Sequence, residues 1–300
     1  MNKIDFIGDT HGYSEKLKML LYKLGYNNEV GYFRHPERQV VFIGDYIDRG
    51  PDNFGVVDIV RRMVDNGSAK ALMGNHEYNA ILFNTLGKNG YLRPHLIKNY
   101  KQHSETLLQH QGKQKEYNAM IKWFKTLPLY IETEGYRACH ACFDAQSVQY
   151  LKEHTDNGVF TDDQFSKSAD KLSNLFRAVE ITCKGLEVEL PKGSSFHDKD
   201  GTERFDIRVK WWENPTGKTY EQMSVVKGIK MEEKKFETPL EYYSPDQVPV
   251  FFGHYWLNGT PKLLKKNVCC LDYSVAKDGY LVAYQWGGEK DLKEDNFIWV

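Results

Sequence analysis

The stretch VVFIGDYIDRG, residues 40–50, is the part of the sequence that first defines a fold and a site together. The apolar run Val40–Ile43 predicts a buried strand, and the Gly-Asp that follows predicts its end. Residues 53–65 then carry apolar side chains at helical spacing before Gly67, which predicts a helix whose buried face holds Phe54, Val57, Val60 and Val64. A buried strand followed by a helix is the unit of an α/β fold.

The same unit occurs on both sides of this stretch. Residues 4–8 predict a strand that ends in Gly-Asp, and residues 14–24 predict the helix that follows it. Residues 69–73 predict a third strand, which ends in Gly-Asn-His-Glu and leads into another helix. Because the carboxyl ends of parallel strands meet at one edge of a sheet, we expect the polar residues after these strands to share one crevice.

Composition limits the class of protein. The chain of 300 residues is 41% hydrophobic and 27% charged, which favours one folded domain across residues 1–300. Its formal net charge of -1 provides no strong field toward nucleic acid or anionic lipid, so we expect neither stable nucleic-acid binding nor membrane association. Asp5 and Asp9 interrupt what would be the apolar core of a signal peptide, which favours a cytoplasmic protein. Composition does not indicate the oligomeric state.

Two segments stand apart from the strand and helix pattern. Residues 86–127 are polar and helix-permissive, and we expect them to form a helical cap. Residues 186–243 are rich in Pro, Gly and charge and are expected to be an insertion, with a hairpin turn at Asp200-Gly201. Residues 204–211 alternate, which predicts a strand with one apolar side and one polar side. The apolar side would hold Phe205, Ile207, Val209 and Trp211, and the polar side Arg204, Asp206, Arg208 and Lys210.

The sparse set of five cysteines suits reduced thiols in a core better than a disulfide framework. Cys139 and Cys142 have the spacing of a redox or zinc pair, but the chain has no second pair of this kind. We therefore expect buried thiols.

Five clusters carry metal-capable or catalytic side chains. In chain order they are GDTHG (8–12), GDYIDRG (44–50), GNHE (74–77), His140 and Gly253-His254. This series resembles the calcineurin-like metallophosphoesterases, and within them the phosphoprotein-phosphatase branch, whose pattern is GDxHG, GDxxDRG, GNHE and two separated histidines. The resemblance covers nearly the whole chain. It implies an α/β fold, a four-layer β-sandwich flanked by helices, with a dinuclear metal site at the strand ends.

The resemblance also implies a role for each residue. Asp45 would bridge two divalent metal ions. The other ligands of the first ion would be Asp9 and His11. Those of the second ion would be Asn75, His140 and His254. Nitrogen and oxygen ligands suit Mn, the expected metal, and equally Fe, Zn or Co. A hydroxide bridging the metals would attack a phosphate monoester. His76 would protonate the leaving group, Asp48 would orient His76, and Arg49 would grip the phosphoryl oxygens.

Departures from the family pattern bear on the substrate. Met73 precedes Gly74 where eukaryotic protein phosphatases of this branch have Arg, and His140-Ala141-Cys142 replaces their HGG. The stretches FFGHYW (251–256) and CLDY (270–273) are instead similar to the symmetrical diadenosine tetraphosphate hydrolases, which typically lack the full Asp-Arg of GDxxDRG. The chain thus resembles a bacterial member between the two groups.

Three functions follow from this position. The leading one is a metal-dependent phosphomonoesterase, whose most specific form would act on phosphoserine or phosphothreonine in proteins. The second is a hydrolase of dinucleoside polyphosphates, and the third is a metal-binding scaffold without turnover. Retention of Asp48, Arg49 and His76 argues against the scaffold, because a scaffold needs no leaving-group acid. The expected substrate is therefore a phosphorylated small molecule, a nucleotide or a phosphoprotein.

A second phosphate-binding arginine is expected in this branch between His140 and His254. Arg208 is the candidate because it lies on the polar side of the predicted strand, although Arg204 shares that side. The nearby Trp211 and Trp212 could stack on a nucleobase, but large aromatic residues more often fill a core.

Overall fold

The larger sheet of the computed structural model contains the predicted strands. The structure describes residues 3–197, 203–226, 229 and 233–300, so the turn expected at 200–201 lies outside the described residues. Strands β1, β2 and β3 are parallel, β15 runs antiparallel beside β1, and β14 and β16 pair with β15. Their bounds are β1 (Lys3–Ile7), β2 (Arg38–Phe42), β3 (Ala69–Ala71), β14 (Asp272–Tyr273), β15 (Tyr280–Trp286) and β16 (Phe297–Trp299).

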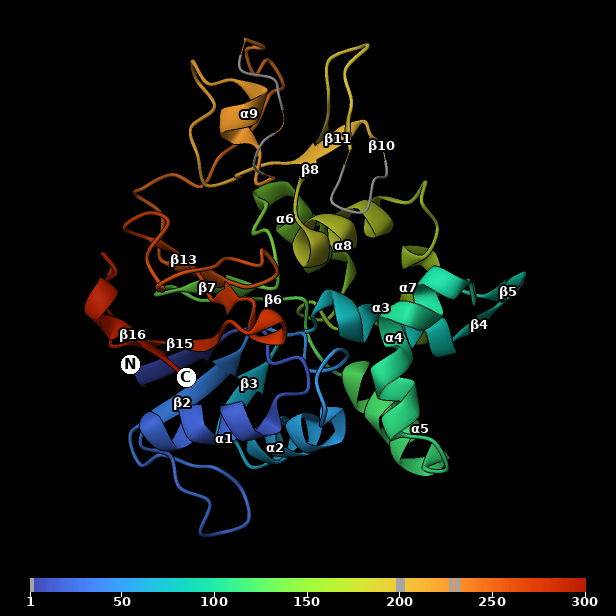
Figure 1. Cartoon of the computed structure of the whole chain (residues 1–300), viewed down its shortest axis with the longest axis vertical. Coiled ribbons are helices and arrows are strands. Elements are labelled where there is room, and N and C mark those ends of the chain that lie inside the picture. Colours follow the sequence, from blue (N-terminus) through green and yellow to red (C-terminus); the bar gives the residue numbers. More distant parts are fainter. Residues whose placement is uncertain (1–2, 198–202, 227–228, 230–232) are drawn as a thin grey trace.

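Helices α1 (Ser14–Lys23) and α2 (Asn53–Asp65) cover the outer face of this sheet (Figure 1). The bounds of α2 match the predicted helix, but its buried face is rotated, because Val56 and Met63 are buried while Phe54 is 46% exposed. The prediction that Phe54 faces the core was therefore wrong. The helix packs on the sheet through Val56, Val57, Val60 and Met63.

A second sheet packs against the inner face of the first. In spatial order its strands are β13 (Val268–Cys270), β12 (Val250–Phe252), β7 (Arg137–Cys139) and β6 (Tyr130–Glu132). The rings of Phe6 on β1 and Phe251 on β12 stack with centroids 3.6 Å apart, and Val41, Ala138 and Tyr284 belong to the same apolar cluster. Alternate residues of β1 and β2 face the second sheet and the outer helices, so both faces of these strands are buried.

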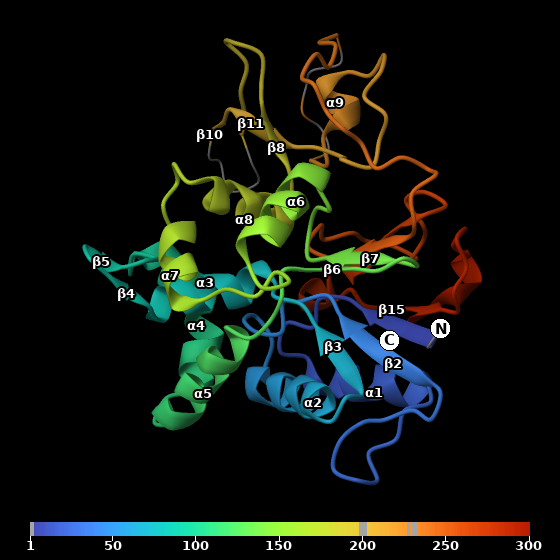
Figure 2. The ribbon, with the colours of Figure 1, turned by 180° about the vertical axis from the view of Figure 1, so that it is seen from behind.

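Helices α6 (Ala145–His154) and α8 (Asn174–Lys184) lie on the far side of the second sheet, with α7 (Asp162–Ser168) beside α8 (Figures 1 and 2). The order helices, sheet, sheet, helices confirms the expected four-layer sandwich. In Figure 2 the helices α1 and α2 and the helices α6 and α8 are on opposite sides of the two sheets.

The segment 86–127 begins as a short hairpin and continues as helices. The hairpin strands are β4 (Leu86–Gly87) and β5 (Gly90–Tyr91), and α4 (Ile97–Gln109) and α5 (Gln114–Phe124) follow. Helix α5 packs against α3 (Asn75–Asn84), which starts directly after β3. The segment thus reaches the end of the sheet where the strand-end motifs lie.

The segment 186–243 contains a small apolar cluster that includes Val188, Ile207, Val209 and Met223. Its elements are β8 (Glu187–Glu189), β9 (Phe196–His197), β10 (Glu203–Arg204), β11 (Asp206–Arg208) and α9 (Tyr220–Met223). The single strand predicted over 204–211 was wrong. The chain bends at Phe205, which is 60% exposed, and changes partner there, because β10 pairs with β9 whereas β11 pairs with β8.

Trp211 and Trp212 fill a core beside the second sheet. Both pack against Phe252, and the indole N–H of Trp211 donates to the carbonyl of Ala141.

The C-terminal region also contains two short 3₁₀ turns, η1 (Val275–Lys277) and η2 (Glu294–Asn296).

Within the described part of the chain, all five cysteines are buried free thiols, as expected. None of the helices in the described ranges combines the length and the apolar character needed to cross a bilayer.

Candidate metal centre and acid dyad

Hydrogen bonds join the loops that follow β1, β2 and β3. The backbone N–H groups of Thr10 and His11 donate to the carbonyl of Asp45 at 3.1 and 2.9 Å. The buried carboxylate of Glu77 accepts from the backbone N–H groups of Asp45, Tyr46 and Gly74 at 2.8, 2.8 and 3.0 Å. Glu77, the last residue of GNHE, therefore ties the loop after β2 to the start of α3.

Two glycines permit this close approach. Gly44 has a φ of +110°, and a Cβ atom there would lie 2.6 Å from the backbone nitrogen of Gly74. A Cβ atom on Gly253 would lie 2.0 Å from a carboxylate oxygen of Asp9. A larger residue at either position would push the loops apart, which explains why the motifs place Gly before the metal-capable residue.

Left-handed backbone conformations gather at the same place. Non-glycine residues rarely adopt a positive φ, and clusters of them mark functional sites. Such residues among the described part of the chain include His11, Asp45, Asp48, Arg49, His254 and Trp256. Hydrogen bonds between the loops hold these conformations in place.

Asp45 lies at the centre of the proposed ligands. The ring nitrogens Nε2 of His11 and His140 lie 3.6 and 3.4 Å from its Oδ2 atom. Ligand atoms of Asp45, His140 and His254 lie within 4.8 Å of one another, and so do those of Asp45, His11 and His76. Asp45 belongs to both groups, which is the position that a bridging ligand requires.

Asn75 and Asp9 complete the set. The Oδ1 atom of Asn75 lies 3.1 Å from Nε2 of His140 and 2.7 Å from Nδ1 of His254. Asp9 is buried, and its Oδ2 atom accepts the backbone N–H of His254 at 3.1 Å. The structure thus brings together all six residues that the sequence proposed as ligands.

Unsatisfied polar atoms test whether the residues fit a cation. Among the described residues, Oδ1 of Asp9 and Nε2 of His11 and His254 are buried without a hydrogen-bond partner. Burying such atoms is costly unless something binds them. Carboxylate and amide oxygens together with imidazole nitrogens suit a divalent transition metal, so the donor set fits the expected ions.

Charge in the site agrees with this fit. Burial and the neighbouring Asp272 raise the pKa of Asp9 well above its usual value. Burial also disfavours the Asp45 carboxylate, but the charges of His140 and His76 hold its pKa well below the usual range. Cations bound between these carboxylates would reduce their mutual repulsion.

His76 and Asp48 form a dyad beside the proposed ligands. Nδ1 of His76 lies 2.5 Å from Oδ2 of Asp48, which leaves Nε2 facing the centre at 3.9 Å from Oδ2 of Asp45. Burial lowers the pKa of His76, but the charges of Asp45 and Asp48 outweigh burial and raise it. Burial opposes the Asp48 carboxylate, yet hydrogen bonds from His103 and His76 hold its pKa well below the usual range.

Sequence reasoning missed His103 and Thr106 on α4. Both contact Asp48, with Nδ1 of His103 at 2.8 Å and the hydroxyl of Thr106 at 2.6 Å from its Oδ1 atom. The available signal was a line of polar residues at helical spacing, Asn99, His103, Thr106 and His110, all of which are buried.

Arg49 lies over an aromatic ring at the edge of the centre. Its guanidinium carbon is 4.5 Å from the ring centroid of Trp256, whose ring also stacks with His11 at 5.6 Å. The ammonium group of Lys277 is 4.1 Å from the same ring. Trp256 is the last residue of FFGHYW, and its position in that motif predicted no contact with Arg49. A planar ring under a guanidinium restrains its position, and a cation–π interaction of this kind contributes about 0.5–1 kcal/mol at exposed sites.

Arg208 is the last residue of β11, in the segment 186–243. Its Nη2 atom forms an ion pair with Glu187 at 3.1 Å, and its charge is a main cause, after burial, of the lowered pKa of His254. Arg204 is on β10, before the bend at Phe205, so the two arginines occupy different strands.

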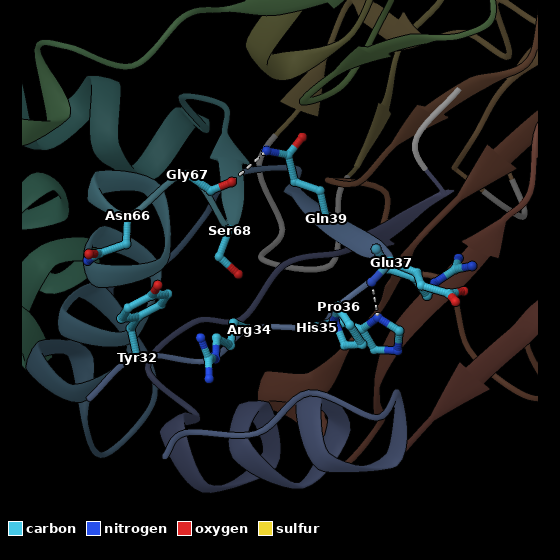
Figure 3. A pocket seen from close by; sticks show the side chains of 10 residues that line it. Tyr32, Arg34, His35, Pro36, Glu37, Gln39, Asn66, Gly67 and Ser68 are labelled. Atoms are coloured by element: carbon cyan, nitrogen blue, oxygen red, sulfur yellow. Dashed lines mark hydrogen bonds between the residues drawn. The ribbon is translucent and has the colours of Figure 1, made fainter. Parts of the chain in front are cut away.

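Two hollows in the described structure have charged residues in their lining. One, of about 320 Å³, lies at the amino ends of β2 and β3, the opposite end of these strands from the metal centre, and Figure 3 shows Arg34, Gln39 and Ser68 among its lining residues. The other, of about 630 Å³, is lined by residues of α3, α4 and α8. Its charged lining residues are Arg93, Lys98, Lys171, Lys184 and Glu180.

The chain matches the model of the calcineurin-like phosphoesterase family over residues 2–255. This match covers most of the sequence, and the chain belongs to that family. It is therefore a metallophosphoesterase, a hydrolase of a family that uses a dinuclear divalent metal site.

Particular relatives carry a narrower name. A bis(5'-nucleosyl)-tetraphosphatase PrpE [asymmetrical] from Oceanobacillus iheyensis is 48% identical over 75 residues, which cover 25% of this chain and 30% of the relative. The protein of the same name from Bacillus cereus is 32% identical over 143 residues, or 46% of this chain and 57% of the relative. The chain thus spans only about a third to just over half of the length of these relatives. Their names specify asymmetrical cleavage, whereas the sequence motifs resembled the symmetrical enzymes.

Solved structures share the fold at low sequence identity. A protein serine/threonine phosphatase from Saccharomyces cerevisiae has a TM-score of 0.50 and 13% identity, covering 100% of this chain and 79% of that one. A cold-active protein-tyrosine phosphatase from Shewanella has a TM-score of 0.50 and 18% identity, covering 95% and 75%. At these identities the likeness concerns the fold alone.

Proposed function

We propose that this protein hydrolyses dinucleoside polyphosphates, with a nucleotide as the leaving group. The observation that supports hydrolysis most directly is the buried pair of His76 and Asp48, whose free Nε2 atom faces Asp45. The named relatives support the substrate class. The cytoplasmic location expected from the sequence is part of this proposal.

The residues divide the chemistry as follows. Two divalent ions, Mn²⁺ first among the candidates, would be held by the six proposed ligands and would supply charge neutralisation and water activation when bound. Arg49, restrained by Trp256, would hold phosphoryl oxygens as a planar fork. His76 would donate the Nε2 proton to the leaving oxygen, and Asp48 would stabilise the charged imidazole.

The larger hollow supports a polyanionic substrate. Its volume of about 630 Å³ falls within the range of small-molecule sites, about 300–1,000 Å³. Arg93, Lys98, Lys171 and Lys184 outnumber Glu180 in its lining. Asn79 lines it one helical turn after the proposed ligand Asn75 on α3. A polyphosphate chain that extends from the metal centre along α3 would meet this charge.

The second candidate is a phosphomonoesterase acting on phosphoserine or phosphothreonine. The complete GDYIDRG motif favours it, because Asp48 and Arg49 are both present, with Asp48 paired to His76 and Arg49 over the ring of Trp256.

A substrate panel separates the candidates. Protein loaded with Mn²⁺ would be given diadenosine tetraphosphate, phosphoserine peptides and p-nitrophenyl phosphate, with His76→Asn as the control for contaminating activity. We expect the highest kcat/KM for diadenosine tetraphosphate, with a mononucleotide and a nucleoside triphosphate as products. A higher kcat/KM for phosphopeptides would overturn the proposal in favour of the second candidate. No turnover by fully loaded protein would favour the scaffold.

A further inference from the structure

Asp48 receives hydrogen bonds from two different histidines. His76 approaches Oδ2 from α3, and His103 approaches Oδ1 from α4, which lies in the segment 86–127. Thr106 donates its hydroxyl to the same Oδ1 atom and accepts the backbone N–H of Asp48 at 3.1 Å. His103, Thr106 and Asp48 are 4%, 0% and 2% exposed, so water does not compete for these bonds.

The direction of these hydrogen bonds can be worked out from the far end of the network. The carbonyl of Ala80 can only accept, so the group of Asn84 that faces it at 2.8 Å is the amide NH₂. The same nitrogen lies 2.6 Å from the hydroxyl oxygen of Tyr117, which therefore accepts. The hydroxyl proton of Tyr117 is then available for Nε2 of His103 at 2.8 Å.

This order determines the tautomer of His103. If Nε2 accepts from Tyr117, the neutral ring carries its proton on Nδ1, which donates to Oδ1 of Asp48. Oδ1 is then occupied by His103 and Thr106, and Oδ2 is left to His76. The hydrogen bonds to Oδ1 fix the plane of the Asp48 carboxylate. Because Oδ2 accepts from His76, they also restrain the orientation of the His76 ring.

We propose that His103 is a positioning residue for acid catalysis, which acts by orienting Asp48 and through it His76. The inference rests on the proposed role of His76 as the leaving-group acid. It assigns a catalytic purpose to α4, because the segment 86–127 supplies the donors that orient the dyad. It is independent of which phosphate ester is the natural substrate.

The test compares His103→Leu, which removes the donor, with His103→Asn, whose amide nitrogen can take the place of Nδ1. The matched control is His110→Leu on the same helix, because His110 is buried and bonds the carbonyl of Thr106 but makes no hydrogen bond to Asp48. Each metal-loaded variant would be assayed on aryl and alkyl phosphates of graded leaving-group pKa. Metal content and melting temperature would be measured in parallel.

We expect His103→Leu to lose about 10-fold more kcat on alkyl phosphates than on p-nitrophenyl phosphate, because poor leaving groups need the acid. His103→Asn should recover most of this loss, and His110→Leu should show none. An equal loss on all substrates, or wild-type kinetics, in folded and loaded His103→Leu would overturn the inference.

Two further variants keep the test decisive. If His103→Leu does not fold, Tyr117→Phe removes the proton donor to Nε2 and should cause a smaller loss with the same leaving-group dependence, whereas unchanged kinetics would overturn the inference. His76→Asn separates this inference from the proposed function. If the loss of kcat depends on the leaving group in His76→Asn but not in His103→Leu, only the role of His103 is contradicted. If the loss in His76→Asn does not depend on the leaving group, the acid role of His76 is contradicted.

Discussion

Asp45 shows how one residue can organise a site. Its φ is +53°, its carbonyl accepts from the loop after β1, and its own N–H donates to Glu77. Its Oδ1 atom accepts the backbone N–H of His76 at 3.0 Å, while Oδ2 faces the imidazoles of His11 and His140. Backbone and side chain are both engaged, so the carboxylate is held in place from several directions.

Replacing Asp45 by Asn should therefore be more harmful than replacing a ligand of one ion. Asn removes the charge that both proposed ions share, and we expect activity to fall by at least about 100-fold, more than in His254→Ala. Metal analysis should find less than two ions per chain in Asp45→Asn. Two undiminished ions in that variant would contradict a bridging role.

At the scale of elements, short helices and strands each place one or a few side chains at or near the proposed metal centre. Helix α3 begins with Asn75 and His76, and Glu77 in its first turn joins the loops. Strand β11 carries Arg208, whose Nε atom is buried without a hydrogen-bond partner among the described residues. Glu187 engages Nη2, so the guanidinium retains N–H donors that this ion pair does not use.

Arg208→Ala should lower turnover on every phosphate ester if these donors bind the phosphoryl group. We expect metal content and melting temperature to change little, since the ion pair with Glu187 is partly exposed to solvent, and exposed pairs contribute about 0–1 kcal/mol. Arg204→Ala, on β10 beyond the bend at Phe205, is the control and should keep wild-type kinetics. Wild-type kinetics in Arg208→Ala would contradict a role for Arg208 in the reaction.

At the scale of the molecule, the proposed ligands come from both sheets of the sandwich. Asp9, His11, Asp45 and Asn75 follow strands of the larger sheet, whereas His140 and His254 follow β7 and β12 of the second. Bound cations would thus join the carboxyl ends of the two sheets. Metal binding at such a place is linked to the stability of the whole fold.

Added Mn²⁺ should raise the melting temperature, and a chelator should lower it. At a free concentration about 100 times the Kd, one site stabilises the folded state by about 2.7 kcal/mol. His254→Ala removes a ligand of the second sheet and should show a smaller shift, measured by calorimetry with and without Mn²⁺. A melting temperature that does not respond to metal would contradict this arrangement.

The local pattern of the sequence determined the parts of the structure that are stabilised locally. Apolar runs followed by Gly-Asp marked β1 and β2, and helical spacing predicted α2 over its observed bounds. The motifs also identified the six proposed ligands, because the carboxyl ends of the strands in each sheet meet at one edge. These features depend on neighbours a few positions apart, which a sequence displays directly.

Only the tertiary structure decided which side chains complete the site and which faces are covered. His103 contacts Asp48 across 55 positions, and Trp256 meets Arg49 across a still longer span, so no local period records either pair. Phe54 and Phe205 fit their patterns but are exposed, because packing partners rather than periodicity determine burial. The members of the proposed acid dyad, His76 and Asp48, were thus readable from the sequence, while the contacts that His103 and Thr106 make with Asp48 became visible only when distant segments were placed side by side.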